Sequence, residues 1–205
     1  MENLKKKLVT NQLIKNRITI IVIFAMSIIP FAVAWYLAKH PDSLHLGVSN
    51  GQLITPPIET QLSEYIGYDS FSAENLKELH GHWVLVNLVP QVCNDACNDS
   101  IYKAHQISLM LGKDISRIRR AAVVMQSTDN GVFKAEWEQD GRLLKTRASA
   151  TLLQKLTNLS AGATSSGDLY LMDPLGNLMM HYPAGYDPYL VRNDLTKLLK
   201  ISQIG

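Results

Sequence analysis

HWVLVNLVPQVCNDACNDSIYKAHQISLML, residues 82–111, is the stretch that decides the fold. It begins with an apolar run from His82 to Pro90, which has the length and composition of a buried β-strand. The segment from Asn98 to Leu111 then carries apolar residues at helical spacing, and a glycine follows it as a helix end. The two cysteines of the chain, Cys93 and Cys97, lie between strand and helix. The stretch therefore predicts a strand-loop-helix unit with both cysteines at the start of the helix.

This cysteine pair is the only arrangement in the sequence that looks like reaction chemistry. The unpaired N–H groups at a helix start stabilise a thiolate, and four-residue spacing brings two sulfurs close enough for a disulfide or a shared soft metal ion. A disulfide that closes so small a loop stabilises a fold by only about 2 kcal/mol, so a purely structural bridge is the less favoured alternative. Asp95 and Asp99 oppose thiolate formation, because no basic residue lies among residues 91–100 to balance them.

Strand and helix patterns on both sides of this unit extend it into an α/β domain. Two apolar segments flank the turn Asp173-Pro174-Leu175-Gly176, which indicates a strand pair, and Asp187 is a candidate cap for a last helix. Residues 130–141 are expected to form a surface hairpin or an irregular excursion that contains Val132, Phe133 and Trp137. The other expected elements are a helix over Ala73 to Leu79 capped by Ser72, a strand over Ala121 to Met125, a helix over Ala150 to Leu159, strands over Leu169 to Met172 and Leu178 to Tyr182, and a helix over Pro188 to Lys200. Their order predicts a βαβ unit followed by ββα, which is a mixed sheet flanked by helices.

An apolar segment near the N-terminus, ITIIVIFAMSIIPFAVAWYLA over residues 18–38, has no charged residue and is long enough to cross a bilayer. Five Lys and Arg precede it, so the N-terminus is expected in the cytoplasm and the rest of the chain in the exported compartment. We therefore expect a cytoplasmic basic tail (1–17), a transmembrane anchor (18–38), a linker and irregular lead-in (39–70) and an exported α/β domain (71–205). A signal peptide cleaved after Ala32-Val33-Ala34 is the alternative.

The charge balance excludes one class of partner. Residues 1–41 carry six basic groups and one acid, so of the 20 basic and 18 acidic residues of the chain, 14 basic and 17 acidic ones follow. A domain with that balance and no basic stripe is not expected to bind nucleic acid.

The anchor, the strand WVLVNLVP (83–90), the CxxxC of Cys93 and Cys97, and the pattern YLMDPLGNLMMHYP (170–183) together resemble the Sco family of cytochrome c oxidase assembly proteins. The resemblance covers about residues 75–200 and implies a thioredoxin-like fold. It also implies copper binding by the two cysteines and a distant histidine, together with thiol–disulfide exchange. Ser165 stands where that histidine is expected, and His181 is the best replacement ligand by region.

The implied function is oxidase assembly on an inner membrane, with the domain in the periplasm or an equivalent compartment. The implied partner is a respiratory oxidase subunit or another assembly protein that bears thiols. Cys93, nearer the strand, is expected to attack and Cys97 to resolve. A general exported thiol–disulfide oxidoreductase and a non-catalytic assembly scaffold are the alternatives.

Overall fold

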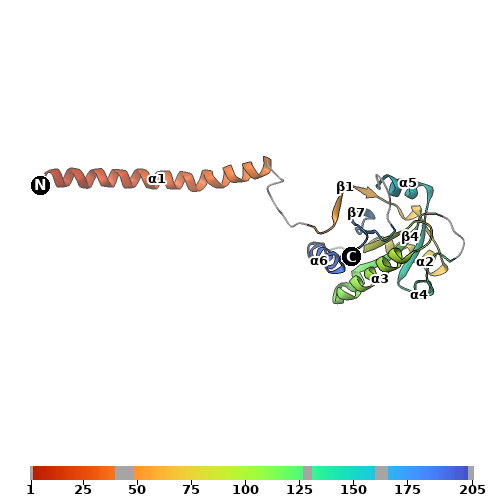
Figure 1. Ribbon diagram of the computed structural model, residues 1–205. Coiled ribbons are helices and arrows are strands. Elements are labelled where there is room, and N and C mark those ends of the chain that lie inside the picture. The colour runs from red at the N-terminus through yellow and green to blue at the C-terminus, as the bar shows by residue number, and fades with distance from the viewer. Residues whose placement is uncertain (1, 40–48, 127–130, 160–165, 203–205) are drawn as a thin grey trace. The chain divides into compact units, whose positions relative to one another are not determined.

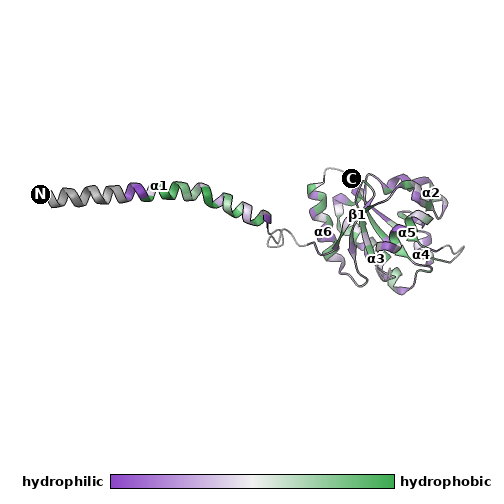
Figure 2. Cartoon of the chain, turned by 90° about the horizontal axis from the view of Figure 1, so that it is seen from above, coloured by the Kyte–Doolittle hydropathy of each residue, from purple (hydrophilic) through white to green (hydrophobic). Residues whose placement is uncertain are grey.

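The computed structural model describes residues 2–39, 49–126, 131–159 and 166–202, and it divides the chain into two units, Met1–Val48 and Ser49–Gly205. The first unit contains one helix, α1 (Glu2–Lys39), shown in Figure 1. Its segment Lys15–Leu37 is long and apolar enough to cross a membrane, and Figure 2 shows the apolar residues along it. This segment overlaps the predicted anchor at residues 18–38, and the predicted basic tail belongs to the same helix.

The second unit is built on a seven-stranded mixed sheet with the strand order β1-β7-β6-β3-β4-β5-β2. Strands β3, β4 and β5 are parallel, whereas β6 and β7 run antiparallel, and β1 and β2 pair antiparallel at the two edges. The strands are β1 (Gln52–Glu59), β2 (Tyr65–Gly67), β3 (Trp83–Val89), β4 (Ile118–Val124), β5 (Leu143–Ala148), β6 (Leu169–Met172) and β7 (Asn177–Tyr182). The helices are α2 (Ser70–Asn75), α3 (Asp95–Met110), α4 (Ala135–Glu138), α5 (Ala150–Leu159) and α6 (Pro188–Ile201), with 3-10 turns η2 (Leu62–Glu64), η3 (Leu76–Leu79) and η4 (Gly112–Arg117). The predicted mixed sheet flanked by helices is confirmed.

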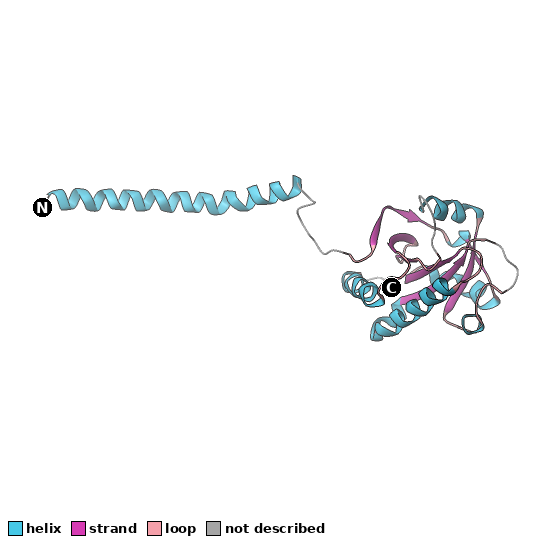
Figure 3. Ribbon diagram, in the orientation of Figure 1, coloured by secondary structure: helices cyan, strands magenta, loops and turns pink. Residues whose placement is uncertain are grey.

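Both faces of the sheet are buried, and this explains why every residue of β3 is apolar or hydrogen-bonded. Val84 and Val86 point to one face, where they pack with Leu152 of α5. Leu85 points to the opposite face, which α3 and α6 cover (Figure 3). The one polar residue of the strand, Asn87, donates from Nδ2 to Oγ of Ser100 in α3 over 2.6 Å. The strand and helix that flank the cysteines are therefore fixed against each other.

The start of the second unit differs from the predicted irregular lead-in, because residues 52–59 form edge strand β1. β1 pairs with β7 at Leu53 opposite Met180 and again at Ile58 opposite Leu178, and the register shifts between these two pairs. Pro56 and Pro57 lie within that shift, where an edge strand tolerates residues that have no N–H to donate. The prolines that suggested a linker thus occupy an irregularity in a strand.

Asp194 of α6 joins the entry of β1 to the rest of the unit. Its buried carboxylate accepts from the backbone N–H of Asn50 at 2.7 Å and of Gly51 at 3.1 Å, and from Nδ2 of Asn50 at 2.9 Å. Hydrogen bonds to a carboxylate are stronger than those between neutral groups. The first residues of the compact unit are therefore bonded directly to its last helix.

The segment after β4 also differs from the sequence analysis. Val132, Phe133 and Trp137 are buried rather than on a surface hairpin, and β5, which was not predicted, follows α4 and runs parallel to β4. The lysine at the centre of β5 is compatible with burial, because Lys145 Nζ lies 2.7 Å from Asp69 Oδ2 and donates to two backbone carbonyls.

A smaller expectation was also wrong. Asp69, not Ser72, caps α2, because its side chain accepts from the backbone N–H of Ser72. Arg120 is buried and pairs with Asp140.

Candidate redox site at the start of α3

Cys93 and Cys97 lie where the carboxyl end of β3 leads into α3. Asn94 caps the helix with its side chain, which accepts from the backbone N–H of Cys97 at 3.0 Å. Cys93 precedes this cap, and Cys97 lies in the first helical turn. The two sulfurs are joined in a disulfide, and the Cα atoms are 5.1 Å apart. The structure thus brings together the two residues that the sequence singled out.

The disulfide lies in an apolar cluster, and its two cysteines differ in exposure. Both cysteines are buried, but Cys93 is 7% exposed and Cys97 is 1% exposed. Val89, Ile101 and Trp137 belong to the cluster that surrounds the pair. The neighbouring Val92 is 54% exposed. The roles of Cys93 as the attacking cysteine and Cys97 as the resolving one stay a prediction.

A buried polar network fixes the backbone at Cys93. Its N–H donates to the carbonyl of Val132 at 3.0 Å, and its carbonyl accepts from Nδ2 of Asn98 at 2.9 Å. Oδ1 of Asn98 in turn accepts from Nε1 of Trp137 at 3.0 Å. Asn98 and Trp137 are both buried, so each bond replaces one that water would otherwise make. The cysteine loop is therefore held by the segment that follows β4 as well as by its own helix.

The sequence pattern gives Asn98 no role and places Trp137 only in a segment of uncertain form. The available signal was an asparagine next to a cysteine on a helix that packs against a sheet, because a buried amide needs hydrogen-bond partners. Its partner could not be identified, since Trp137 lies on an element that pattern alone did not define.

The acidic residues beside the cysteines each have a basic partner in the structure. Asp95 Oδ1 lies 3.7 Å from Lys134 Nζ, and Asp99 Oδ2 lies 2.8 Å from Lys103 Nζ. Both carboxylates are exposed, so each pair contributes little to stability. The pairs nevertheless reduce the negative field at the cysteines that the sequence alone suggested.

The loop before β6 packs against the first turn of α3. Gly167 has φ of +103°, and a Cβ added there would lie 2.9 Å from the carbonyl oxygen of Ala96. Ser166 Oγ donates to Oδ1 of Asn94. Ser165, which stands at the expected position of the ligand histidine, lies outside the described residues.

His181, the predicted replacement ligand, has other partners. Its Nε2 lies 3.0 Å from Oδ2 of Asp168, and its ring stacks on Tyr170 with centroids 4.7 Å apart. Within the described parts of the chain, no three His, Cys, Asp or Glu side chains are grouped to hold a metal ion. The structure therefore does not bring His181 to the cysteines. Once reduced, Cys93 and Cys97 fit copper as two soft thiolate ligands, without a third ligand from these residues.

The comparisons with known proteins agree with this architecture. Residues 83–202 match the family described as "Transmembrane-like, thioredoxin-like, C-terminal domain". The structure of Arabidopsis thaliana ScoI with copper bound is similar at 15% identity and a TM-score of 0.50, over 74% of this chain and 99% of that one. Yeast Sco1 with copper bound is similar at 14% identity and a TM-score of 0.50, over 76% of this chain and 95% of that one. No curated protein sequence matches the chain.

The family match covers more than half of the chain and includes both cysteines. The similarity to the two Sco structures, at 14% and 15% identity, shows a shared fold alone. The chain belongs to the transmembrane-like, thioredoxin-like C-terminal domain family, and its fold is similar to that of the two Sco proteins.

Proposed function

We propose that this protein is a membrane-anchored thiol–disulfide exchange factor that acts in cytochrome c oxidase assembly. The observation that carries the proposal is the disulfide between Cys93 and Cys97 at the start of α3, in which Cys93 is the more exposed of two buried cysteines. A bridge across so short a loop adds little stability, so its value lies in being opened and closed.

The exchange reaction balances with the two cysteines alone. The thiolate of reduced Cys93 attacks one sulfur of a disulfide in the client, and a mixed disulfide forms as the first client thiolate leaves. The thiolate of Cys97 then attacks the sulfur of Cys93. The Cys93–Cys97 disulfide forms, the second client thiolate leaves, and two electrons have passed to the client. A dithiol protein on the same side of the membrane must reduce the pair before the next cycle.

We propose as client an oxidase subunit whose copper-binding cysteines must be reduced before they take up metal. Two observations support this client: the fold shared with two Sco proteins whose structures contain copper, and the helix long and apolar enough to anchor the domain at a membrane. The expected location is the inner membrane, with the domain in the periplasm or an equivalent compartment. A reporter fused after Gly205 should be active only on the exported side, and activity in the cytoplasm would reverse this orientation.

The test of the exchange proposal is thiol labelling followed by mass measurement. Protein isolated without reductant should carry no labelled cysteine, and protein treated with a dithiol should carry two. The reduced protein should then reduce a model disulfide peptide built on a copper-site sequence. Cys97→Ser should accumulate the mixed disulfide through Cys93, whereas Cys93→Ser should form none. Two free thiols in freshly isolated protein, or no transfer to the peptide, would refute the proposal.

Copper is the cargo that a reduced pair can hold. Two thiolates suit Cu(I), whereas Cu(II) prefers additional nitrogen ligands. We expect anaerobic titration of the reduced protein to show exchangeable Cu(I) binding that either Cys→Ser variant abolishes, and no visible thiolate–Cu(II) band. A strong band that disappears in His181→Ala would show that His181 does act as a ligand, and binding unaffected by both cysteine variants would place copper elsewhere.

A further inference from the structure

A hollow of about 420 Å³ opens at the end of the sheet that lies away from the cysteines. Its walls come from the last turns of α3, from α2 and η3, and from the first residues of β4 and β5. Because β3, β4 and β5 are parallel, the starts of β4 and β5 lie at the opposite edge from the end of β3, where Cys93 follows. The thiol chemistry therefore makes no use of this hollow.

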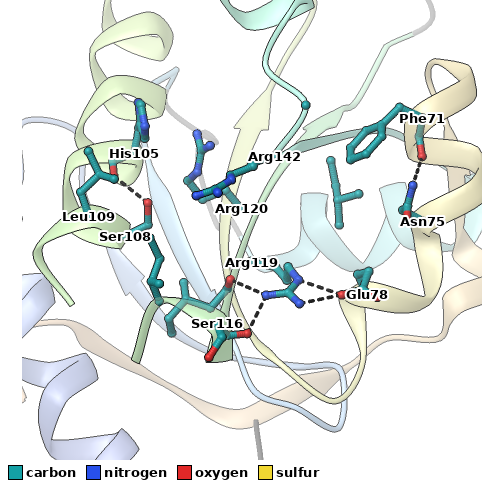
Figure 4. A pocket seen from close by; sticks show the side chains of 14 residues that line it. Phe71, Asn75, Glu78, His105, Ser108, Leu109, Ser116, Arg119, Arg120 and Arg142 are labelled. Carbon is teal, nitrogen blue, oxygen red and sulfur yellow. Dashed lines mark hydrogen bonds and ion pairs between the residues drawn. The ribbon is translucent and has the colours of Figure 1, made fainter. Parts of the chain in front are cut away.

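Three of the six arginines that follow residue 41 line the hollow, although that part of the chain has an excess of acidic residues. They are Arg119, Arg120 and Arg142, which Figure 4 shows between His105 on one side and Phe71 on the other. A cationic hollow in an otherwise acidic domain indicates an anionic ligand.

Two of the arginines are partly neutralised. Nη2 of Arg119 lies 2.8 Å from Oε2 of Glu78, and Nη1 of Arg119 donates to the carbonyl of Ser116, as the dashed lines in Figure 4 show. Nη2 of Arg120 donates to Oδ2 of Asp140 at 2.9 Å. Arg119 thus has a structural role, and Arg120 uses one half of its guanidinium.

Two other arginine donors, Nη1 of Arg120 and the side chain of Arg142, have no acceptor within the described residues. Nη1 of Arg120 is buried without a hydrogen-bond partner, although the side chain is only 4% exposed. The side chain of Arg142, an exposed residue, likewise has no partner there, and its backbone N–H donates to Oδ1 of Asp140. A buried N–H without an acceptor costs about 1–3 kcal/mol, which a ligand oxygen would relieve.

His105 lies beside these charged groups, and they affect its pKa. Burial lowers the pKa of His105, and the nearby cations of Arg120 and Arg142 lower it further, against the opposing effect of Asp140. A neutral imidazole adds no charge but can donate or accept a hydrogen bond. Counting Asp140 and Glu78 against the three arginines, one positive charge remains uncompensated.

The walls of the hollow also include apolar side chains. Phe71 and Leu109 are partly exposed there, and Ile115 and Leu144 lie deeper. Guanidinium groups bind phosphate through paired N–H donors, and a phosphate carries a charge of about −1.5 to −2 and three acceptor oxygens, more than a carboxylate offers. We propose that this hollow binds a phosphate monoester with an apolar body, its phosphate on Arg142 and Arg120 and its apolar part against Phe71 and Leu109. The source is either a free phosphoester or the headgroup of an anionic lipid.

The test uses the full chain in a non-ionic detergent and three probes measured by calorimetry. Phenyl phosphate represents a free phosphoester, dioctanoyl phosphatidic acid represents a lipid headgroup, and benzoate is the monoanion with the same ring. Arg142→Gln should weaken phosphate binding by about tenfold, the loss expected when a charged hydrogen-bond pair is removed. Lys200→Gln, which removes an exposed positive charge from α6, is the matched control and should bind as the original protein does.

Saturable binding of phenyl phosphate that weakens in Arg142→Gln but not in Lys200→Gln supports the site with a soluble ligand. The same pattern for phosphatidic acid alone supports the site with a lipid as the source. In both cases the ring protons of His105 should shift in NMR spectra on addition of the probe, a readout that does not depend on thiol chemistry. The proposal is overturned by binding equal in both variants, by benzoate binding as tightly as the phosphate, or by no saturable binding of any probe at millimolar concentrations.

Discussion

Replacing Asn98 with alanine should destabilise the domain more than a typical helix substitution does, because its amide joins two buried groups that do not otherwise meet. Asn98→Ala leaves the carbonyl of Cys93 without the donor at 2.9 Å and Nε1 of Trp137 without the acceptor at 3.0 Å. Each buried group left without a partner costs about 1–3 kcal/mol. Alanine returns about 0.5 kcal/mol through its higher helix propensity. We therefore expect the unfolding free energy to fall by about 2–5 kcal/mol.

The measurement is urea unfolding of oxidised residues 49–205, the compact unit, followed by far-UV circular dichroism. Asn193→Ala is the matched control, because Asn193 is an exposed asparagine on α6. It should change stability by no more than about 0.5 kcal/mol. Trp137→Phe removes the other end of the bond, and the double variant should show a coupling energy of about 1 kcal/mol. A loss in Asn98→Ala no larger than in the control, or additive effects in the double variant, would refute the role assigned to the network.

Three further predictions concern stability. Gly167→Ala should lower the unfolding free energy by about 1–3 kcal/mol more than Gly185→Ala, because both glycines have positive φ but only Gly167 also faces a carbonyl, that of Ala96; equal losses in denaturant titrations would contradict the close approach. Asp69→Ala should lose about 3 kcal/mol, because it strands the buried Lys145 ammonium and removes the cap of α2, whereas Asp187→Ala removes only the cap of α6 and should lose about 1 kcal/mol; similar midpoints for the two variants would argue against the buried pair. Burial raises the pKa of Asp140, but the N–H of Arg142 and the charge of Arg120 outweigh it and hold that pKa below the ordinary aspartate value of 3.8. The stabilisation that ionised Asp140 gives the folded state is therefore complete above the ordinary aspartate pKa and is lost as pH falls below it. Asp140→Asn should flatten the acid limb of a stability-versus-pH curve, and an unchanged limb would refute the assignment.

Local patterns in the sequence were sufficient for the centre of the fold. The apolar run of β3 and the helical spacing of α3 are properties of neighbouring residues, and they placed both cysteines correctly between the two elements. The same reasoning identified the β6–β7 pair from its turn residues. The strands that it missed depend on distant partners. β5 is buried because Asp69, from a separate element, neutralises Lys145, and no local pattern encodes that pairing.

The candidate site was predictable to the same extent. Spacing identified Cys93 and Cys97, but the residues that hold their loop come from the segment after β4, which has no clear periodicity. His181 was predicted as a ligand from its region of the sequence alone. Its contact with Asp168, which directly precedes β6, depends on the pairing of β6 with β7 in three dimensions, so spacing along the chain does not reveal it.

The carboxylate of Asp194 has a mechanical consequence for a domain held by its N-terminal side. Tension that reaches the domain along the chain enters at Asn50 and Gly51, just before edge strand β1. An edge strand pulled at its end would otherwise detach from its neighbour one hydrogen bond at a time. Because three bonds carry the force from these residues directly into α6, the pull is shared with a packed helix before it loads the β1–β7 ladder. Such an arrangement protects the edge of the sheet when tension is applied at the N-terminal side of the domain.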